Sequence, residues 1–401
     1  MPQKKAYIPW RERQRRHAVE KKSAMAHRGN MDIPFLLLVL LLTGVGLVML
    51  FSASFPSAYY ETGGANPAYY FKKQAIFAVL GLIAMFFLAN VNYQRFRGAA
   101  KPLLGLSIFL LVMVLIPHVG ITANHATRWL GIPGVFQFQP SEIAKLAVIL
   151  YFGDSISKKK QRMLDWRQGI VPYAIILGII SILMLLEPHL SGTILIMGTG
   201  IMMLVVGGIP AKFVALGFGG VAAVAISYIK AVEAGIISYG ANRIQMWHNP
   251  WLDARDDGYQ MVQSLIAIGS GGLLGVGLGK SRQKFLYLPE EHNDFIFAVV
   301  CEELGLIGAC VIMLIFSLLI IRGFWIALHA RDRFGALIVV GIMTHLGLQI
   351  FLNIAVVSGL VPATGISLPF FSYGGTALAL QLVEMGIVLS VSRQIPAPRQ
   401  G

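Results

Sequence analysis

Five carboxylates crowd one short stretch of an otherwise apolar chain. Glu290, Glu291 and Asp294 belong to LPEEHNDF, where a long apolar run begins, and Glu302 and Glu303 follow a few turns later. Ionisable groups at or below a membrane surface are costly, so they are functional candidates by default. Burial and like-charged neighbours raise a carboxyl pKa, and a raised pKa suits a general base that accepts a proton from a hydroxyl group.

Asp294 is the strongest of these candidates. It stands directly before Phe295 and Ile296, where the chain enters the apolar run. Glu290 and Glu291 fit better as solvated charges of the preceding loop. We therefore predict that Asp294 is the catalytic base.

A second ionisable pair, Glu142 and Lys145, lies in QPSEIAKLA. The spacing of three places both side chains on one helical face. They are either a self-neutralised structural ion pair or part of a polar cavity that faces Asp294, and the residues alone leave both interpretations open. Arg128, in the loop before this segment, could hold a phosphate, although a lone external arginine is usually only solvated.

The glycine-rich stretch GVGLGKS resembles a phosphate loop but lacks the required spacing. A Walker A motif needs a glycine where Leu274 stands. A glycine turn followed by Lys280, Arg282 and Lys284 could still bind a pyrophosphate through backbone N–H groups and cations. Alternatively, the glycines let helices pack closely, and both interpretations stay open here.

Other chemistries find no support in the sequence. The nine histidines show neither HExxH spacing nor a Cys/His cluster, so no metal ligands are predicted. No G-x-S-x-G motif is present for a hydrolase.

The composition predicts an all-α integral membrane protein. Of 401 residues, 56 % are hydrophobic and 13 % are charged, which is more apolar surface than a soluble domain can bury. Apolar runs of membrane-spanning length recur, and backbone groups in lipid must be satisfied within a helix. We expect ten spans, near 33–54, 74–91, 102–118, 139–153, 170–186, 190–208, 211–229, 296–321, 335–358 and 374–392.

The placement of the basic residues predicts the orientation. Ten crossings put both ends of the chain on the same side, and most lysines and arginines then fall in the cytoplasmic segments. The net charge of +14 is therefore a topology signal and not evidence for nucleic acid. We divide the chain into a basic cytoplasmic tail (1–31), one transmembrane domain (32–393) and a second cytoplasmic tail (394–401). The long external loop, about 230–295, carries most of the external charge and is the expected site of function.

Three blocks of sequence resemble the SEDS family, the group of FtsW, RodA and SpoVE that serves bacterial cell shape, elongation, division and sporulation. They are QMVQSLIAIGSGGLLGVGLGKSRQKFLYLPEEHNDFIFAVVCEELGLIG (260–308), RWLGIPGVFQFQPSEIAKLA (128–147) and NIAVVSGLVPATGISLPFFSYGGTAL (353–378). The resemblance runs from about residue 33 to 393. The wording GISLPFFSYGGT is more similar to the FtsW/SpoVE branch than to RodA.

The resemblance implies a ten-helix, GT-C-like bundle with one large external loop between spans seven and eight. It implies a peptidoglycan glycosyltransferase of the cytoplasmic membrane that polymerises lipid II on the outer face, during cell division or shape maintenance. Implied partners are a class B penicillin-binding transpeptidase and divisome or elongasome proteins. The family's essential aspartate lies in an HTDF motif, which is HNDF here, so its role falls on Asp294.

The family's QPSE-x-x-K block maps onto Glu142 and Lys145 and favours a substrate-binding role for that pair. One departure is EPHLSG (187–192), which stands where many members have QPDLG, so no role is predicted for Glu187 or His189.

The expected reaction is an inverting glycosyl transfer from a strand on undecaprenyl pyrophosphate to lipid II. Asp294 would deprotonate the acceptor hydroxyl, and nearby cations would stabilise the departing pyrophosphate. The candidates for that second role are Arg128, Lys145, Arg243, Lys280 and Lys284. A divalent cation such as Mg²⁺ or Mn²⁺ could assist without an assigned ligand set, and no nucleotide or organic cofactor is expected.

Two other functions fit a bundle of this kind. A flippase or transporter for lipid II is the main alternative, because topology and an intramembrane Glu–Lys pair suit it equally well. A scaffold that only recruits the transpeptidase is the other. The sequence does not choose between roles in division, elongation and sporulation.

Overall fold

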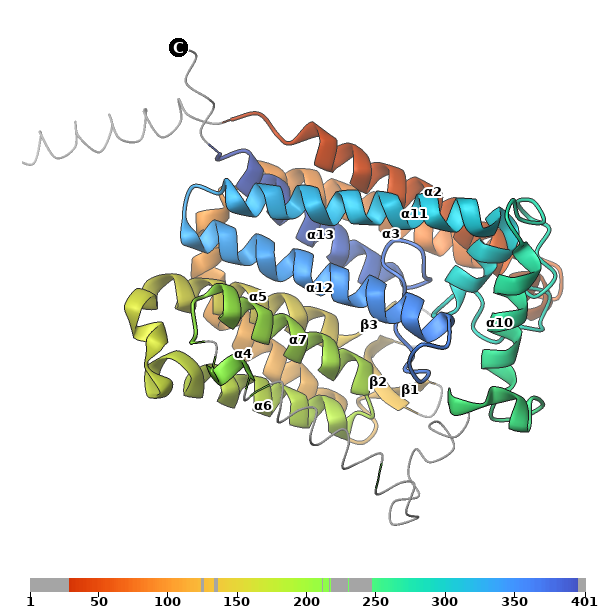
Figure 1. Ribbon diagram of the computed structural model, residues 1–401, viewed down its shortest axis with the longest axis horizontal. Helices are drawn as coiled ribbons and strands as arrows, with labels where there is room; N and C mark the ends of the chain where they lie inside the picture. Colours follow the sequence, from red (N-terminus) through yellow and green to blue (C-terminus); the bar gives the residue numbers. More distant parts are fainter. Residues whose placement is uncertain are drawn as a thin grey trace, which may run out of the picture.

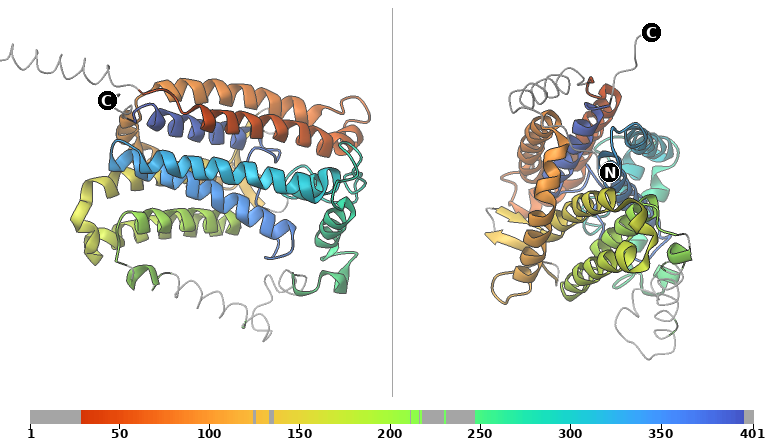
Figure 2. Two further views of the ribbon diagram at one scale, coloured as in Figure 1. Left: turned by 45° about the horizontal axis from the view of Figure 1, so that its top comes forward. Right: turned by 90° about the vertical axis from the view of Figure 1, so that its left-hand side faces the viewer.

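The computed structural model describes residues 29–123, 126–132, 136–210, 212–215, 217, 230 and 247–395. The described helices form one bundle, in which the long helices run side by side (Figures 1 and 2). Both ends of the described chain lie at one end of the bundle, called here the terminal end. The short helix α10 (Tyr259–Gly271) lies at the other, called here the α10 end.

Nine helices of the described chain run along the bundle: α2 (Ile33–Glu61), α3 (Tyr69–Asn90), α4 (Phe96–Val114), α5 (Pro140–Lys159), α6 (Val171–Leu186), α7 (Leu190–Val206), α11 (Ile296–Leu328), α12 (Arg333–Val357) and α13 (Gly375–Ser392). They coincide with nine of the ten predicted spans. The remaining one, 211–229, falls mostly outside the described residues. Short helical turns, η1 (Tyr93–Arg95), η2 (Lys160–Leu164) and η3 (Trp166–Ile170), connect helices at the terminal end.

The described helices are those of a multi-pass membrane protein. Seven of them are long and apolar enough to cross a membrane, and α7 is a shorter apolar helix. In α12 and α13 about two thirds of the most apolar window is buried, whereas in the other spanning helices the buried share is 39 % or less. The outer helices therefore expose leucine, isoleucine and phenylalanine to lipid, while α12 and α13 pass through the core of the bundle.

Side-chain caps fix the starts of two helices at the terminal end. Asp32 precedes α2 and accepts a hydrogen bond from the backbone N–H of Phe35 at 3.0 Å. Asp332 precedes α12 and accepts from the N–H of Gly335 at 2.9 Å. Such caps satisfy N–H groups that a helix leaves unpaired in its first turn, so the polar residues mark where each helix begins.

A small antiparallel sheet at the α10 end adds to the predicted all-α architecture. Its strands are β1 (Ile121–Ala123), β2 (Ala126–Ile132) and β3 (Phe136–Phe138), in that order. Ile121 pairs with Trp129, and Leu130 pairs with Phe138. The sheet connects α4 to α5, and its strand β2 contains Arg128, which therefore lies at the α10 end.

The segment from residue 247 to 295 closes the α10 end. It begins with η4 (Pro250–Asp253), and α10 then runs across the ends of the long helices (Figure 1). Beyond α10, 272–295 has no regular helix, and α11 is broken at Gly305, whose φ is 66°.

Candidate active site

Asp294 lies where the loop at the α10 end turns into α11. Its backbone oxygen accepts a hydrogen bond of 2.8 Å from Asn353 Nδ2, which also donates to the backbone oxygen of Ile366 at 2.6 Å. Its Oδ2 lies 3.7 Å from the position that a Cβ atom on Gly365 would occupy. Asn353 thus joins the loop of Asp294 to the segment between α12 and α13.

The environment of Asp294 gives it the protonation behaviour of a base at neutral pH. Burial raises the pKa of its carboxyl group to about 7, and the nearby Glu290 charge adds to the rise. A backbone hydrogen bond and His292 act in the opposite direction. A carboxylate with such a pKa can accept a proton from a hydroxyl group better than an ordinary aspartate can.

The backbone on both sides of Asp294 is fixed by hydrogen bonds from neighbouring elements. Tyr373 N donates to the backbone oxygen of His292 at 2.8 Å, and Ser372 Oγ donates to that of Asn293 at 2.6 Å. Gln74 of α3 then binds the Ser372 oxygen through Nε2 at 3.1 Å. Hydrogen bonds to neighbouring elements therefore fix the position of the loop that carries Asp294.

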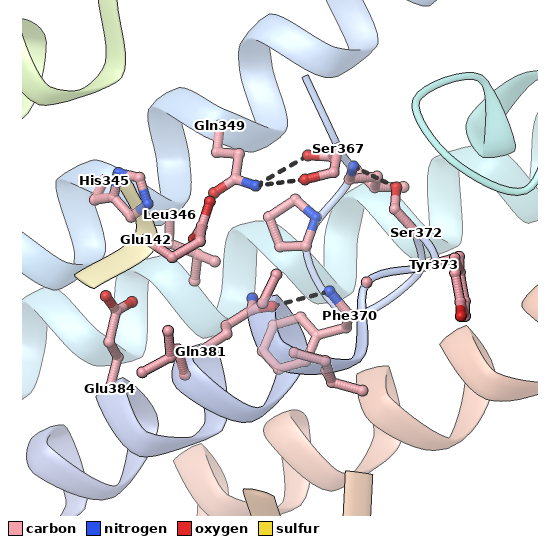
Figure 3. A pocket seen from close by; sticks show the side chains of 16 residues that line it. Glu142, His345, Leu346, Gln349, Ser367, Phe370, Ser372, Tyr373, Gln381 and Glu384 are labelled. Carbon is pink, nitrogen blue, oxygen red and sulfur yellow. Dashed lines mark hydrogen bonds between the residues drawn. The ribbon is translucent and has the colours of Figure 1, made fainter. Parts of the chain in front are cut away.

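A small polar cavity of about 40 Å³ adjoins this loop (Figure 3). Its walls come from α5, α12, α13 and the segment 367–374. Two wall residues, Ser372 and Tyr373, make the hydrogen bonds to the loop of Asp294, whereas Asp294 itself is not part of the wall. Gln349 Nε2 donates to Ser367 O at 3.0 Å, and Gln381 Oε1 accepts from Phe370 N at 3.1 Å. The volume suffices for a few water molecules but not for a sugar.

Glu142 and Lys145 form an ion pair at the wall of this cavity. Lys145 Nζ lies 2.6 Å from Glu142 Oε1, and the lysine is only 4 % exposed. Glu142 lines the cavity (Figure 3). The ion pair is therefore present, and one of its two members belongs to the polar wall; a substrate-binding role for the pair stays a prediction.

Sequence reasoning missed two ionisable residues of the same cavity, His345 of α12 and Glu384 of α13. Both point into it in Figure 3 and both are buried. Lys145 is close enough to interact electrostatically with both. Each of the two is the kind of lone ionisable residue inside a predicted membrane span that marks a functional candidate, and this signal could have identified them from the sequence.

Arg128 lies at the junction between α6 and α7. Its Nε donates to the backbone oxygen of Glu187 at 3.3 Å, and its NH2 group donates to that of Pro188. Glu187 is 1 % exposed, and neither carboxylate oxygen has a hydrogen-bond partner in the described structure. Burial raises the Glu187 pKa to about 8 against the influence of Arg128, and burial lowers the His189 pKa to about 3.

The other cations that were predicted to bind the pyrophosphate do not line the cavity in the described structure. Lys284 Nζ is buried in an ion pair with Glu303 Oε1 at 2.8 Å and lies 3.0 Å from Ser52 Oγ. In this conformation it joins the loop to α11 and α2. Lys280 is exposed at the α10 end. Arg243 lies outside the described residues.

The glycine-rich stretch packs into the break of α11. Val276 N donates to Glu302 O and Gly277 N to Glu303 O, both at 3.0 Å, and Leu306 N donates to Gly272 O at 2.9 Å. These backbone groups are used within the protein, so close packing is the interpretation that the structure supports.

Side chains secure the same region. The Glu302 carboxylate accepts from Arg282 N at 2.9 Å and from Ser281 Oγ at 2.5 Å. Glu302 and Glu303, first seen as deep carboxylates of unknown role, therefore hold the loop that precedes Asp294.

No metal site is formed by the protein alone in the part of the chain that the structure describes. No three or more His, Cys, Asp or Glu side chains gather there in an arrangement that could hold an ion.

The fold and site define an integral membrane protein with a polar cavity beside a supported carboxylate at one end of its bundle. The sequence profile of the FtsW/RodA/SpoVE family, described as cell cycle proteins, matches residues 33–396. The chain belongs to this family.

Two relatives extend the comparison. Stage V sporulation protein E of Bacillus subtilis is 43 % identical over 363 residues, which cover 90 % of this chain and 97 % of that protein. A probable peptidoglycan glycosyltransferase FtsW of Geobacter sulfurreducens is 41 % identical over 367 residues, covering 91 % and 95 %. The chain is thus similar to the FtsW/SpoVE branch, as the sequence predicted.

Solved structures share the fold. One chain, from a study of how a peptidoglycan synthase complex coordinates polymerization and crosslinking, has a TM-score of 0.75 and 29 % identity. The rod shape determining protein RodA of Thermus thermophilus has a TM-score of 0.67 and 28 % identity. In each case 91 % of this chain and 98 % of the other are covered.

Proposed function

We propose that this protein is a peptidoglycan glycosyltransferase that polymerises lipid II into glycan strands. The observation that carries the proposal is a supported carboxylate with a pKa of about 7, on a loop that also adjoins a polar cavity within the helix bundle. The family and the names of the relatives give the substrate class.

The reaction is a single displacement with inversion at the donor sugar. Asp294 accepts the proton of the acceptor's GlcNAc 4-hydroxyl while that oxygen attacks the anomeric carbon of the donor's MurNAc. The bond from that carbon to the pyrophosphate oxygen breaks, and undecaprenyl pyrophosphate leaves with the electron pair. One base is enough, because the leaving pyrophosphate needs charge stabilisation more than a proton.

Lys145 is the best-placed cation for the pyrophosphate. It is buried beside the cavity, where a charge acts more strongly than in water. Glu142 keeps the ammonium in place at 2.6 Å until substrate arrives. Because the cavity is smaller than a sugar, the 367–374 segment or α13 must move outward when the substrates bind.

The site faces the outer side of the cytoplasmic membrane in this proposal, with both termini in the cytoplasm. Lipid II and the polyprenyl-linked strand reach it from the bilayer. The similarity to a chain of a peptidoglycan synthase complex supports pairing with a crosslinking enzyme, a class B penicillin-binding transpeptidase of the divisome or elongasome. A divalent cation enters only as a companion of the pyrophosphate.

The test incubates purified protein with labelled lipid II in detergent, with and without the transpeptidase. Detergent removes the two sides of a membrane, so a flippase yields no product while a polymerase yields long glycan chains. Chains made by the wild-type protein support the proposal. Their absence, with folded protein that binds lipid II, would favour the flippase.

A further inference from the structure

Aromatic rings from three separate elements meet next to the Asp294 loop. Tyr70 of α3 lies against His292, with ring centroids 4.4 Å apart and planes at 34°. Tyr373, between α12 and α13, meets Tyr70 edge to face at 4.8 Å. Tyr69 meets Tyr70 in the same manner at 5.3 Å. We call Tyr69, Tyr70 and Tyr373 the aromatic shelf.

The shelf is attached directly to the loop of the candidate base. Tyr373 N donates to the backbone oxygen of His292, two residues before Asp294. Tyr373 also lines the polar cavity, at the end away from Glu384 (Figure 3). All three tyrosines are half-buried, so each keeps part of its surface accessible.

Polar groups surround the rings. Tyr70 donates its hydroxyl hydrogen to Glu61 Oε2 at 2.5 Å, and Lys73 Nζ lies 2.6 Å from the Tyr69 hydroxyl. Aromatic faces with polar groups at their edges suit a ligand that is apolar on one face and rich in hydroxyl and amide groups at its rim. A pyranose ring has this form, because its axial C–H groups make one face apolar.

Anchoring at the membrane surface does not account for this arrangement. Aromatic residues of an interfacial belt point outward from the protein. Tyr59 and Tyr60 at the end of α2 have the exposure of such residues, with 54 % and 74 % of their surface accessible. The shelf rings instead converge on one another and on His292.

We propose that the aromatic shelf is a binding subsite for an N-acetylated sugar ring, which it places next to Asp294. The inference rests on the proposed function for the identity of the sugar. Stacking on the shelf holds a ring of the lipid-linked substrate beside the base, and Lys73 and Glu61 bind its hydroxyl and acetamido groups. The shelf residues position the substrate and take no part in the proton transfer.

The first test needs no variant and no catalysis. Saturation-transfer NMR on the wild-type protein in detergent uses chitotriose, a soluble trimer of N-acetylglucosamine, as the probe. Irradiating the aromatic protons should transfer saturation most strongly to the ring C–H protons of the sugar. Transfer confined to the acetamido methyl group, or no transfer, would overturn the proposal.

The second test compares Tyr70→Leu and Tyr373→Leu with the corresponding Phe variants, and with Tyr59→Leu as the matched control. Each Leu variant should bind chitotriose about tenfold more weakly, which corresponds to about 1.4 kcal/mol. It should raise KM for lipid II with a smaller effect on kcat, while the Phe variants and Tyr59→Leu stay near wild type.

The outcomes separate the shelf from the polymerase. Unchanged chitotriose binding in folded Tyr70→Leu and Tyr373→Leu would overturn the shelf even if lipid II is polymerised normally. Lost chitotriose binding would support the shelf even if the wild-type protein made no polymer, and that result would leave only the proposed function in error.

Discussion

At the scale of single residues, Asp294 lies in an environment that opposes its charge. Burial and the Glu290 charge raise its pKa to about 7, against about 3.9 for an unperturbed aspartate. Catalytic groups often carry such a stability cost, since a site poised to react is rarely optimal for folding. The cost can be measured directly.

We predict that Asp294→Asn stabilises the protein at pH 8. A carboxyl group with a raised folded-state pKa binds its proton more tightly when folded, so the native state loses stability as pH rises from about 4 to about 7. Asparagine does not ionise and avoids this loss. The expected gain is about 2 kcal/mol at pH 8 and near zero at pH 4, after allowance for solvent screening.

Thermal denaturation in detergent at both pH values measures the difference. Asp256→Asn, at an exposed position before α10, is the control and should behave like wild type. Equal melting temperatures for Asp294→Asn and wild type at pH 8 would show that ionisation of the Asp294 carboxyl group does not destabilise the folded protein.

At the scale of elements, the break in α11 supports the loop that carries Asp294. Gly305 has a φ of 66°, and a Cβ atom there would lie 2.3 Å from the backbone nitrogen of Gly275. The first part of α11 and the glycine-rich segment therefore form one unit, joined by backbone hydrogen bonds and by the Lys284–Glu303 ion pair.

Gly305→Ala should destabilise the protein by about 2 kcal/mol or more, because both the backbone conformation and the space exclude a side chain. Gly178→Ala is the matched control, since nothing lies within 4 Å of a Cβ atom at that position in α6. Thermal denaturation compares the two. Similar melting temperatures for both variants would mean that the break is not required.

The sequence predicted the long helices well and the irregular features poorly. Membrane-spanning helices follow from the length of apolar runs, a strong local signal. The break at Gly305 lies inside the apolar run EELGLIGACV, and it forms only because a distant glycine segment pairs with the freed backbone groups. Two of the three strands of the sheet, β1 and β3, are only three residues long and are too short to show a pattern.

The sequence likewise indicated some residues of the candidate site and not others. Asp294 and the Glu142–Lys145 pair could be proposed from the sequence because each lies in an ordered motif with a recognisable spacing, and their roles stay predictions. His345 and Glu384 stand alone in different helices, and only the packing of α12 against α13 shows that they share a cavity. The pairing of Lys284 with Glu303 likewise depends on tertiary contacts.

At the scale of the whole molecule, the two ends of the bundle differ in kind. The α10 end holds Asp294, the sheet and the aromatic shelf. The terminal end holds ion pairs that join helices: Arg97 contacts Asp154 at 3.2 Å and Asp332 at 2.9 Å. The proposed orientation puts the first end outside the cell and the second in the cytoplasm.

Cysteine labelling tests that orientation. In a variant whose native Cys301 and Cys310 are replaced by alanine, Lys280→Cys should react with a membrane-impermeant maleimide added to intact cells. Lys158→Cys, at an exposed position of the terminal end, should react only after the membrane is opened. The reverse pattern would place the site in the cytoplasm and exclude polymerisation on the outer face.

The most direct test of the central claim measures glycan polymerisation from lipid II by wild type and Asp294→Asn between pH 5 and 9. A base with a pKa near 7 must lose its proton to act, so wild-type activity should rise through pH 7 and level off above it. Asp294→Asn should fold and bind lipid II but lose at least about a hundredfold in rate at every pH. Substantial polymerisation by Asp294→Asn, with an unchanged pH profile, would show that the base lies elsewhere.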